Sequence, residues 1–304
     1  MNDKKLFGTM AFIGIGLIGS SLARVVRREG LADRIVVCAR RDETLQTAMD
    51  LGLADQVTKD PAEAAKDADI VLICTPIGTN GAIAQAIAPV LKPGQIVTDV
   101  GSVKQAVIEA VSPHMPEGVH FVPGHPLAGT ESTGPENGFD TLFEGRWCVL
   151  TPPEGTDQAA VEKVAELWRR AGSQVDVIDP AHHDWVLAIT SHLPTLIAFN
   201  IVNTVADLEE STQQEVIKYS ATGFRDFTRI AAQDPIMWRD VYLNNSEAVL
   251  EMLQRFSEDL SRLQRAIRWG EGDVLEDIFR RSRDIRRGII DAGQADPPEP
   301  VDPG

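Results

Sequence analysis

Short runs of apolar residues alternate with amphipathic stretches along the first 180 residues of the chain. The apolar runs have the length and composition of buried strands, and the stretches between them have helical spacing. The predicted helices in this half include Ser20–Arg28 and Asn80–Leu91. The predicted strands are Met10–Ile13, Arg34–Cys38, Asp69–Cys74, Gln95–Asp99, Val119–Val122, Trp147–Leu150 and Gln174–Ile178. This alternation predicts an α/β fold, a doubly wound parallel sheet with helices on both faces.

The second half of the chain has a different pattern, in which apolar residues recur at helical spacing. Asp179 and Pro180 form a typical helix start, an N-cap residue followed by proline in the first turn. The predicted helices beyond them are Ala181–Leu208, Asp234–Trp269 and Val274–Ala292. Because 304 residues exceed what one core usually supports, two domains are expected. We place a first domain at 1–179, an all-helical domain at 180–292 and a disordered, Pro- and acid-rich tail at 293–304.

Charge and cysteine content exclude several classes of protein. The chain carries 29 Lys and Arg against 45 Asp and Glu, a formal net charge of −16. This balance argues against nucleic acid as a partner, although a few local arginines suffice to bind an anionic small molecule. Cys38, Cys74 and Cys148 match no metal spacing and predict reduced thiols in a cytoplasmic protein without a metal site. No membrane association is expected, because glycines interrupt the apolar N-terminal stretch and we expect no other run long enough to span a bilayer.

A glycine pattern, Gly14-x-Gly16-x-x-Gly19, follows the first predicted strand and opens the first predicted helix. In this strand–turn–helix context the spacing is typical of a dinucleotide-binding loop, whereas a merely structural turn is the alternative. Gly14 permits the tight turn, Gly16 the close approach of a pyrophosphate, and Gly19 the packing of helix on strand. The helix N-terminus supplies free N–H groups for the phosphates. The expected cofactor-binding residues of this loop are Gly14, Ile15, Gly16, Leu17, Ile18 and Gly19.

The end of the second predicted strand bears on the choice of nicotinamide cofactor. An acidic residue there would hold the ribose 2′-hydroxyl of NAD, but the chain has Arg40 and Arg41 instead. Two arginines suit the 2′-phosphate of NADP, which is therefore favoured over NAD. The alternative is that both arginines are solvated and that Asp42 takes the NAD role. Thr75 and Pro76, which follow a later strand, are also expected to contact the cofactor.

Two polar segments are expected at the carboxyl edge of the sheet, where parallel α/β folds bind their substrates. One is Asp99–Lys104, with the sequence DVGSVK, and the other is Pro123–Glu131, with the sequence PGHPLAGTE. Within the second, His125 lies between a glycine and a proline and has little backbone freedom. Because its unperturbed pKa lies near neutrality, histidine at this edge is a candidate general base.

Motifs along most of the chain, from Phe12 to Asp240, resemble those of the prephenate/arogenate (cyclohexadienyl) dehydrogenase family. They are, in order, GxGxxGxS, GSVK, GHPLAGTE, SHLP and GFRDFTRIA with DPxMWRD. The resemblance implies a Rossmann-type domain followed by an all-helical dimerisation domain, and a homodimer. It also implies an oxidative decarboxylation: hydride leaves C4 of a cyclohexadienol for NAD(P)⁺, the 4-hydroxyl loses its proton, and CO₂ leaves C1. Prephenate would give 4-hydroxyphenylpyruvate and arogenate would give tyrosine.

The resemblance also assigns roles to individual residues of the matching motifs. His125 is implied as the base for the 4-hydroxyl, and Ser102 as a residue between that histidine, the substrate hydroxyl and the nicotinamide. Arg229 is implied as the carboxylate clamp, with Arg225 one helical turn earlier. The residues expected to bind substrate are Arg229, Arg225, His192, Glu131, Thr130 and Trp238. Many members carry a second histidine where this chain has Thr195, which leaves that position without an assigned role.

Several of these residues have a structural alternative. Ser102 precedes a predicted helix and is also a candidate N-cap, and both roles can hold at once. Arg229 is spaced to pair with Asp226 within one helix. Lys104 is expected to be structural or close to the cofactor rather than catalytic.

Other sequence features were weighed against different functions. The run His182-His183-Asp184 invites a metal-site interpretation, which we reject because adjacent helical positions point in different directions. A β-hydroxyacid dehydrogenase of the 6-phosphogluconate type would need a lysine on the first long helix after the Rossmann domain, and none occurs before Leu208. A non-catalytic NAD(P)-sensing module would need the glycines but not His125 together with Arg229.

Overall fold

The computed structural model describes residues 5–206 and 210–291. The tail predicted to be disordered, 293–304, lies outside the described residues. The chain divides into two compact units, Met1–Val249 and Leu250–Gly304. All strands of the described chain, and all the residues predicted for the site, belong to the first unit.

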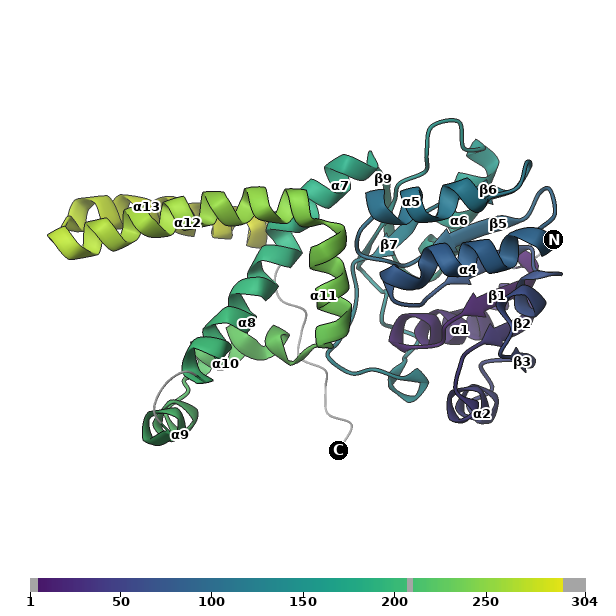
Figure 1. The fold of residues 1–304 in the computed structure, drawn as a ribbon, viewed down its shortest axis with the longest axis horizontal. Helices are drawn as coiled ribbons and strands as arrows, with labels where there is room; N and C mark the ends of the chain where they lie inside the picture. Colours follow the sequence, from purple (N-terminus) through teal and green to yellow (C-terminus); the bar gives the residue numbers. More distant parts are fainter. Residues whose placement is uncertain (1–4, 207–209, 292–304) are drawn as a thin grey trace. The chain divides into compact units, whose positions relative to one another are not determined.

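The first unit is built on a six-stranded parallel sheet with the strand order β3-β2-β1-β4-β5-β6 (Figure 1). Its strands are β1 (Phe7–Ile13), β2 (Ala32–Cys38), β3 (Gln56–Thr58), β4 (Ile70–Ile73), β5 (Ile96–Asp99) and β6 (His120–Phe121). The predicted doubly wound fold is confirmed, and the three-residue strand β3 is an addition that its short, mixed sequence did not reveal. The strand order reverses between β1 and β4, and parallel sheets bind ligands at the carboxyl ends of such a switch.

Helices cover both faces of this sheet because the strand side chains alternate between two cores. Met10 and Phe12 of β1 enter one core, while Ala11 and Ile13 enter the other. The first core includes residues of α1 (Leu17–Glu29), α2 (Asp42–Asp50) and α6 (Gln158–Arg170). The second includes residues of α3 (Pro61–Ala65), α4 (Asn80–Ile87) and α5 (Gln105–Val111).

The last strands of the first domain do not extend this sheet, although the sequence pattern predicted one parallel sheet. The segments β7 (Gly124–Pro126), β8 (Trp147–Leu150) and β9 (Gln174–Val177) form a second sheet of their own. Strand β7 is antiparallel to β8, and β8 is parallel to β9. The pairing along β5 ends with the bond from Val122 N to Val97 O, and the next amide on that edge, Gly124 N, donates to the side chain of Asp99 instead of its backbone. The chain therefore leaves the first sheet directly before His125.

The remainder of the first unit is helical. It contains α7 (Pro180–Leu187), a π-helical turn (Ala188–His192), α8 (Leu193–Ala206), α9 (Glu210–Lys218), α10 (Thr222–Thr228), a 3₁₀ turn (Arg229–Ala232) and α11 (Pro235–Asn244). The second unit holds most of α12 (Ser246–Trp269) and all of α13 (Gly272–Asp291). Shorter 3₁₀ turns lie at Ile77–Thr79, Ala88–Val90, Ser112–His114 and Pro135–Asn137.

Two helices predicted as continuous are interrupted. The first contains the π-helical turn, which precedes Pro194; proline cannot donate to the carbonyl four residues earlier, so the regular ladder is broken there. The second is divided by Asn245, whose φ of −122° and ψ of 34° are not helical. Both interruptions adjoin residues of the candidate site described below. π-Helical turns in particular are frequent at functional sites.

One described stretch, Pro180–Ala206, is long and apolar enough by length and composition to cross a membrane. The expectation that no such run exists is therefore wrong as a statement about composition. Near the start of the stretch, His183 and Asp184 are buried and hydrogen-bonded to residues of the sheet domain. This end of the stretch is packed inside the protein.

Candidate functional site

The glycine loop between β1 and α1 has the geometry of a dinucleotide-binding turn. Gly14 has a φ of +91°, and a Cβ there would lie 2.7 Å from the carbonyl oxygen of Cys74. A Cβ on Gly19 would lie 2.9 Å from the carbonyl oxygen of Gly14, so this glycine permits the helix to pack on the loop. A Cβ on Gly16 would meet nothing within 4 Å, and no side chain caps α1. The loop thus leaves both space and free N–H groups for a phosphate group.

The other residues predicted to bind the cofactor follow neighbouring strands of the same sheet. Arg40 and Arg41 follow β2, are exposed, and make no ion pair with any described residue. Asp42, the alternative NAD-binding residue, has its carboxylate 2.7 Å from Lys59 Nζ. Thr75 follows β4 beside the glycine loop, where its methyl group would lie 2.8 Å from a Cβ on Gly14. Pro76 precedes the 3₁₀ turn that continues from it.

His125, the predicted base, lies on β7 opposite Val149 and is 8% exposed. Its Nδ1 lies 2.9 Å from Nε2 of His183, and its Nε2 makes no hydrogen bond with a described residue. Burial, and then the nearby His183, hold the pKa of His125 well below its ordinary value of 6.5. The ring is therefore neutral at physiological pH, as a general base must be.

His183 continues a chain of buried polar contacts that begins at His125. Its Nδ1 lies 2.8 Å from Oδ1 of Asp184, the next residue on α7. The Asp184 carboxylate also accepts the backbone N–H of Lys104 at 2.7 Å and that of Gln105 at 2.9 Å. A carboxylate of the helical region therefore anchors the segment that follows β5.

Lys104 is fully buried and structural. Its Nζ donates to Asp99 Oδ2 and to the carbonyl oxygen of Gly124, each at 2.7 Å. Ser102 is partly buried and makes no side-chain hydrogen bond with a described residue. The alternative that Ser102 caps α5 is wrong, because Lys104 is the N-cap residue and Asp184 accepts the N–H groups there.

His192, on the π-helical turn, is a third buried histidine of the site. Its Nδ1 lies 3.1 Å from Nδ2 of Asn245, which also donates to the carbonyl oxygen of Asp184 at 2.9 Å. Trp238 presents its ring edge-on to His192, with ring centroids 6.1 Å apart. The Nε2 atom of His192 is buried without a hydrogen-bond partner in the described chain. Burial lowers the pKa of His192 from 6.5 to about 4, so this ring is also neutral.

The predicted carboxylate clamp lies in a more open environment. Arg229 Nη1 is 3.2 Å from Oε2 of Glu131, and the two side chains are 61% and 43% exposed. The alternative pairing of Arg229 with Asp226 does not occur; the partner instead comes from the loop after β7. Arg225 is exposed and makes no ion pair within the described chain, and Thr130 accepts the N–H of Ser132.

Sequence reasoning missed three residues of this network: His183, Asp184 and Asn245. Adjacent side chains in His182-His183-Asp184 were expected to point apart, but those of His183 and Asp184 meet in a hydrogen bond. A usable signal was present, since a histidine and an aspartate in the first turns of an otherwise apolar helix require buried partners. Asn245 carries no comparable signal.

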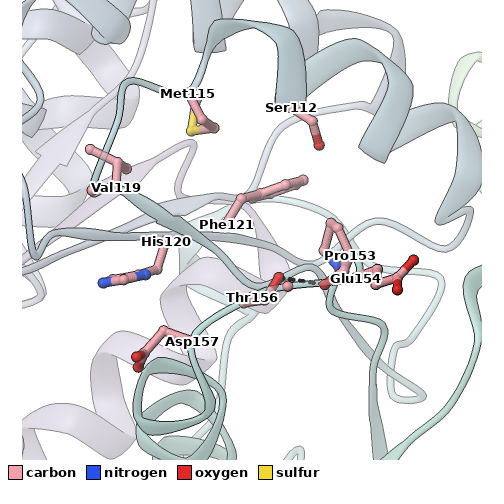
Figure 2. Close-up of a pocket in the computed structure, with 11 residues that line it drawn as sticks. Ser112, Met115, Val119, His120, Phe121, Pro153, Glu154, Thr156 and Asp157 are labelled. Atoms are coloured by element: carbon pink, nitrogen blue, oxygen red, sulfur yellow. Dashed lines mark hydrogen bonds between the residues drawn. The ribbon is translucent and has the colours of Figure 1, made fainter.

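A surface hollow of about 360 Å³ lies elsewhere, beside β6 (Figure 2). Met115, Phe121 and Pro153 contribute apolar surface, and His120 lies at its side. Thr156 bonds the carbonyl of Pro153, and Asp157 caps α6. None of the predicted site residues lines this hollow, so the candidate site is defined by its side chains rather than by the hollow.

Comparison with known proteins gives a consistent result over nearly the whole chain. Residues 22–177 match the family model described as "Prephenate dehydrogenase, nucleotide-binding domain", and residues 179–281 match "Prephenate dehydrogenase, dimerization domain". The cyclohexadienyl dehydrogenase of Zymomonas mobilis is 39% identical over 93% of this chain and 97% of its own length. The prephenate dehydrogenase of Bacillus subtilis is 30% identical over 95% of this chain and 77% of its own.

Solved structures agree with these relatives. Prephenate dehydrogenase from Aquifex aeolicus, in complex with hydroxyphenyl propionate and NAD⁺, has a TM-score of 0.86 and 33% identity, covering 93% of this chain and 98% of that one. Arogenate dehydrogenase from Synechocystis has a TM-score of 0.77 and 29% identity, covering 92% and 99%.

Proposed function

The chain belongs to the prephenate dehydrogenase family, and we propose that it oxidises and decarboxylates prephenate, arogenate or both, in the formation of tyrosine. The observation that carries the proposal is His125, a buried and neutral imidazole with a free Nε2 beside the carboxyl end of β5. A β-hydroxyacid dehydrogenase would need a catalytic lysine, whereas Lys104 is held by Asp99 and Gly124. A sensing module would not need a buried base at all.

The reaction requires a base, a hydride acceptor and cationic groups that bind the substrate carboxylates. His125 Nε2 takes the proton of the 4-hydroxyl as C4 loses hydride. The C1–carboxylate bond then breaks, its electrons complete the aromatic ring as CO₂ leaves, and the phenolate oxygen so formed takes up a proton. The nicotinamide, when bound, supplies the hydride acceptor. The glycine loop fits such a cofactor, because Gly16 has open space and α1 has uncapped N–H groups.

His192 and Ser102 each carry a polar side-chain atom without a described partner, which suits a substrate hydroxyl or carboxylate. Because Asn245 donates to Nδ1 of His192, the proton of this neutral ring is on Nε2, where it is a buried donor without a described partner. Ser102, whose hydroxyl is unengaged by described residues, is proposed to lie between the substrate hydroxyl and the nicotinamide. Both groups are therefore available to hydrogen-bond a substrate.

The carboxylate clamp is proposed to be Arg229. Among the described residues, only Glu131 engages this guanidinium, at one nitrogen, which leaves the remaining N–H groups for a bidentate contact with a substrate carboxylate. Arg225 on α10, which also lacks an ion-pair partner in the described chain, adds positive charge. Trp238 and Thr130 are proposed to border the substrate.

NADP is the proposed cofactor in preference to NAD. Arg40 and Arg41 make no ion pair with a described residue at the end of β2, whereas the competing Asp42 is bound to Lys59. An arginine pair there suits a 2′-phosphate. The relative from A. aeolicus was solved with NAD⁺, so the choice needs a direct assay.

We further propose a cytoplasmic homodimer formed through the helical domain, with the domain boundary at residue 179. The matched family model over residues 179–281 is described as a dimerization domain. An apolar groove along α8, lined by Leu196, Phe199 and Val202, is a surface that a second copy would cover. Size-exclusion chromatography with light scattering should give a dimer, and a stable monomer at micromolar concentration would contradict this proposal.

The central experiment crosses prephenate or arogenate with NAD⁺ or NADP⁺ and follows reduced cofactor. If none of the four combinations reduces cofactor, the proposed function fails. His125→Asn should then lower turnover at least about a hundredfold while leaving cofactor affinity near normal, because only the base is lost. The matched control is His120→Asn, at the hollow beside β6, which should leave turnover unchanged. Unchanged turnover in His125→Asn would refute the role of His125.

A further inference from the structure

A continuous line of buried hydrogen bonds leads from the proposed base to a carboxylate. His125 Nδ1 lies 2.9 Å from His183 Nε2, and His183 Nδ1 lies 2.8 Å from Asp184 Oδ1. All three side chains are buried: His125 is 8% exposed, His183 0% and Asp184 1%. The base comes from β7, whereas the other two residues come from α7, in the helical part of the chain.

The Asp184 carboxylate, at the end of this line, determines which atom donates in each hydrogen bond. The Asp184 carboxylate accepts two backbone N–H groups, from Lys104 and Gln105, and has only acceptors to offer. His183 Nδ1 must therefore carry a proton. Burial lowers the pKa of His183, although the Asp184 carboxylate acts to raise it. The ring is therefore neutral, and its Nε2 carries a lone pair that can accept a hydrogen bond.

The proton position on His183 also fixes the proton position on the His125 ring. Because His183 Nε2 accepts, His125 Nδ1 must donate, and a neutral imidazole carries only one proton. His125 Nε2 is then a lone pair, directed away from His183. The charged groups around this line are Asp184, Lys104 and Asp99, and the last two neutralise each other as a buried ion pair.

We propose that His183 and Asp184 are positioning residues that hold His125 in the tautomer protonated at Nδ1, which keeps Nε2 as the proton acceptor. The proposal rests on the base role given above to His125. Without His183, the imidazole would be free to carry its proton on Nε2, and in that form it would offer the substrate hydroxyl a donor instead of a base.

Asp184 also joins α7 to the segment that follows β5, so the orientation of His125 depends on how these two segments pack. Its two oxygens bind consecutive N–H groups at Lys104 and Gln105, just beyond Ser102. A single carboxylate therefore orients the base through His183 and fixes the segment that presents Ser102. The two groups proposed to meet the substrate hydroxyl are held by one residue.

The tautomer can be measured without any activity assay. Two-bond ¹H–¹⁵N correlation spectra of the full-length protein, labelled with ¹⁵N-histidine and recorded at pH 8, distinguish imidazoles protonated at Nδ1 from those protonated at Nε2. The signals of His125 are assigned by their loss in His125→Asn. We expect the Nδ1–H form in the native protein. The Nε2–H form would overturn the proposal, whatever the enzyme's turnover.

Two substitutions at His183 distinguish loss of the hydrogen-bond acceptor from a mere change of side-chain shape. His183→Leu removes the acceptor, so His125 should gain the Nε2–H form and kcat should fall at least about tenfold, with cofactor affinity unchanged. His183→Gln places an amide oxygen near the Nε2 position, where it can accept from His125, so it should restore the Nδ1–H form and most of kcat. If both variants keep the native tautomer and kcat, His183 has no positioning role.

The matched control is His182→Gln on the same helix. His182 is exposed and its ring stacks on Trp185, so this variant should leave both the tautomer of His125 and kcat unchanged. A loss in His182→Gln equal to that in His183→Leu would assign the effect to the helix and overturn the proposal. Failure of the proposed function is distinguishable, because the native protein would then reduce no cofactor with either substrate, whereas the tautomer of His125 is measured without turnover.

Discussion

Replacing Lys104 by methionine tests whether a buried ion pair holds the edge of the site. Lys104 Nζ lies 2.7 Å from Asp99 Oδ2 and 2.7 Å from the carbonyl oxygen of Gly124, and both charged side chains are completely buried. Methionine is similarly long and apolar, so the substitution removes the charge without opening a large cavity. It leaves one carboxylate and one carbonyl oxygen without their cationic donor.

The expected loss of stability follows from these contacts. Breaking a buried pair by removing one partner typically lowers the free energy of unfolding by about 3–5 kcal/mol. Asp99 keeps two backbone donors, Gly101 N at 2.7 Å and Gly124 N at 3.2 Å, so we expect the lower end of that range. A loss of about 3 kcal/mol corresponds to a fall in Tm of roughly 6–12 °C for a unit of this size.

Urea titration and calorimetry of Lys104→Met would measure this loss. The control is Lys92→Met, because Lys92 forms an exposed pair with Asp67 and its loss should change Tm little. Turnover measured well below Tm should also fall in Lys104→Met, since Gly124 precedes His125 directly. A decrease in the free energy of unfolding below about 1 kcal/mol would refute the importance assigned to the pair.

Three further outcomes are expected. Gly16→Ala should retain native Tm and weaken cofactor binding, because the added Cβ meets no protein atom but enters the space left for the phosphates. Gly14→Ala should lower Tm, because Gly14 has a positive φ and an added Cβ would clash with Cys74. Equal losses of Tm in the two variants would contradict this. The double variant Arg40→Ala, Arg41→Ala should raise KM for NADP about ten- to a hundredfold and leave KM for NAD nearly unchanged, as steady-state assays would show. Burial lowers the pKa of His192 to about 4, so the unfolded chain takes up this proton first as pH falls. Stability should therefore decline from about pH 6.5 towards pH 4, by up to ~3 kcal/mol. Urea titrations across this range should show a smaller decline for His192→Gln.

The parts of the fold that sequence predicted well are those with local causes. Strand β1, the glycine loop and α1 follow one another within a single stretch, so their hydrophobic spacing and glycine positions suffice to predict them. The elements that sequence missed depend on partners. Strand β3 is a strand only because β2 pairs with it, and β7 leaves the first sheet where Gly124 N bonds the side chain of Asp99 instead of continuing the ladder.

The candidate site divides in the same way. His125 and Arg229 could be singled out from motifs, but the partner of Arg229 is Glu131 from a distant loop, rather than the neighbouring Asp226. For His183 and Asp184 the sequence suggests only a metal site, which helix geometry argues against. Their actual contacts join α7 to β7 and to the start of α5, which no periodic pattern in the chain reveals.

The sequence by itself determined a dinucleotide-binding loop, a histidine restrained by its flanking residues, and a helical second domain, because each rests on residues close together in the chain. Only the tertiary structure decided which atom of His125 is free to accept a proton. That depends on His183, 58 residues later, and on a carboxylate buried beside it. The protonation state of a buried side chain is set by the groups that packing brings to it, and local sequence does not encode them.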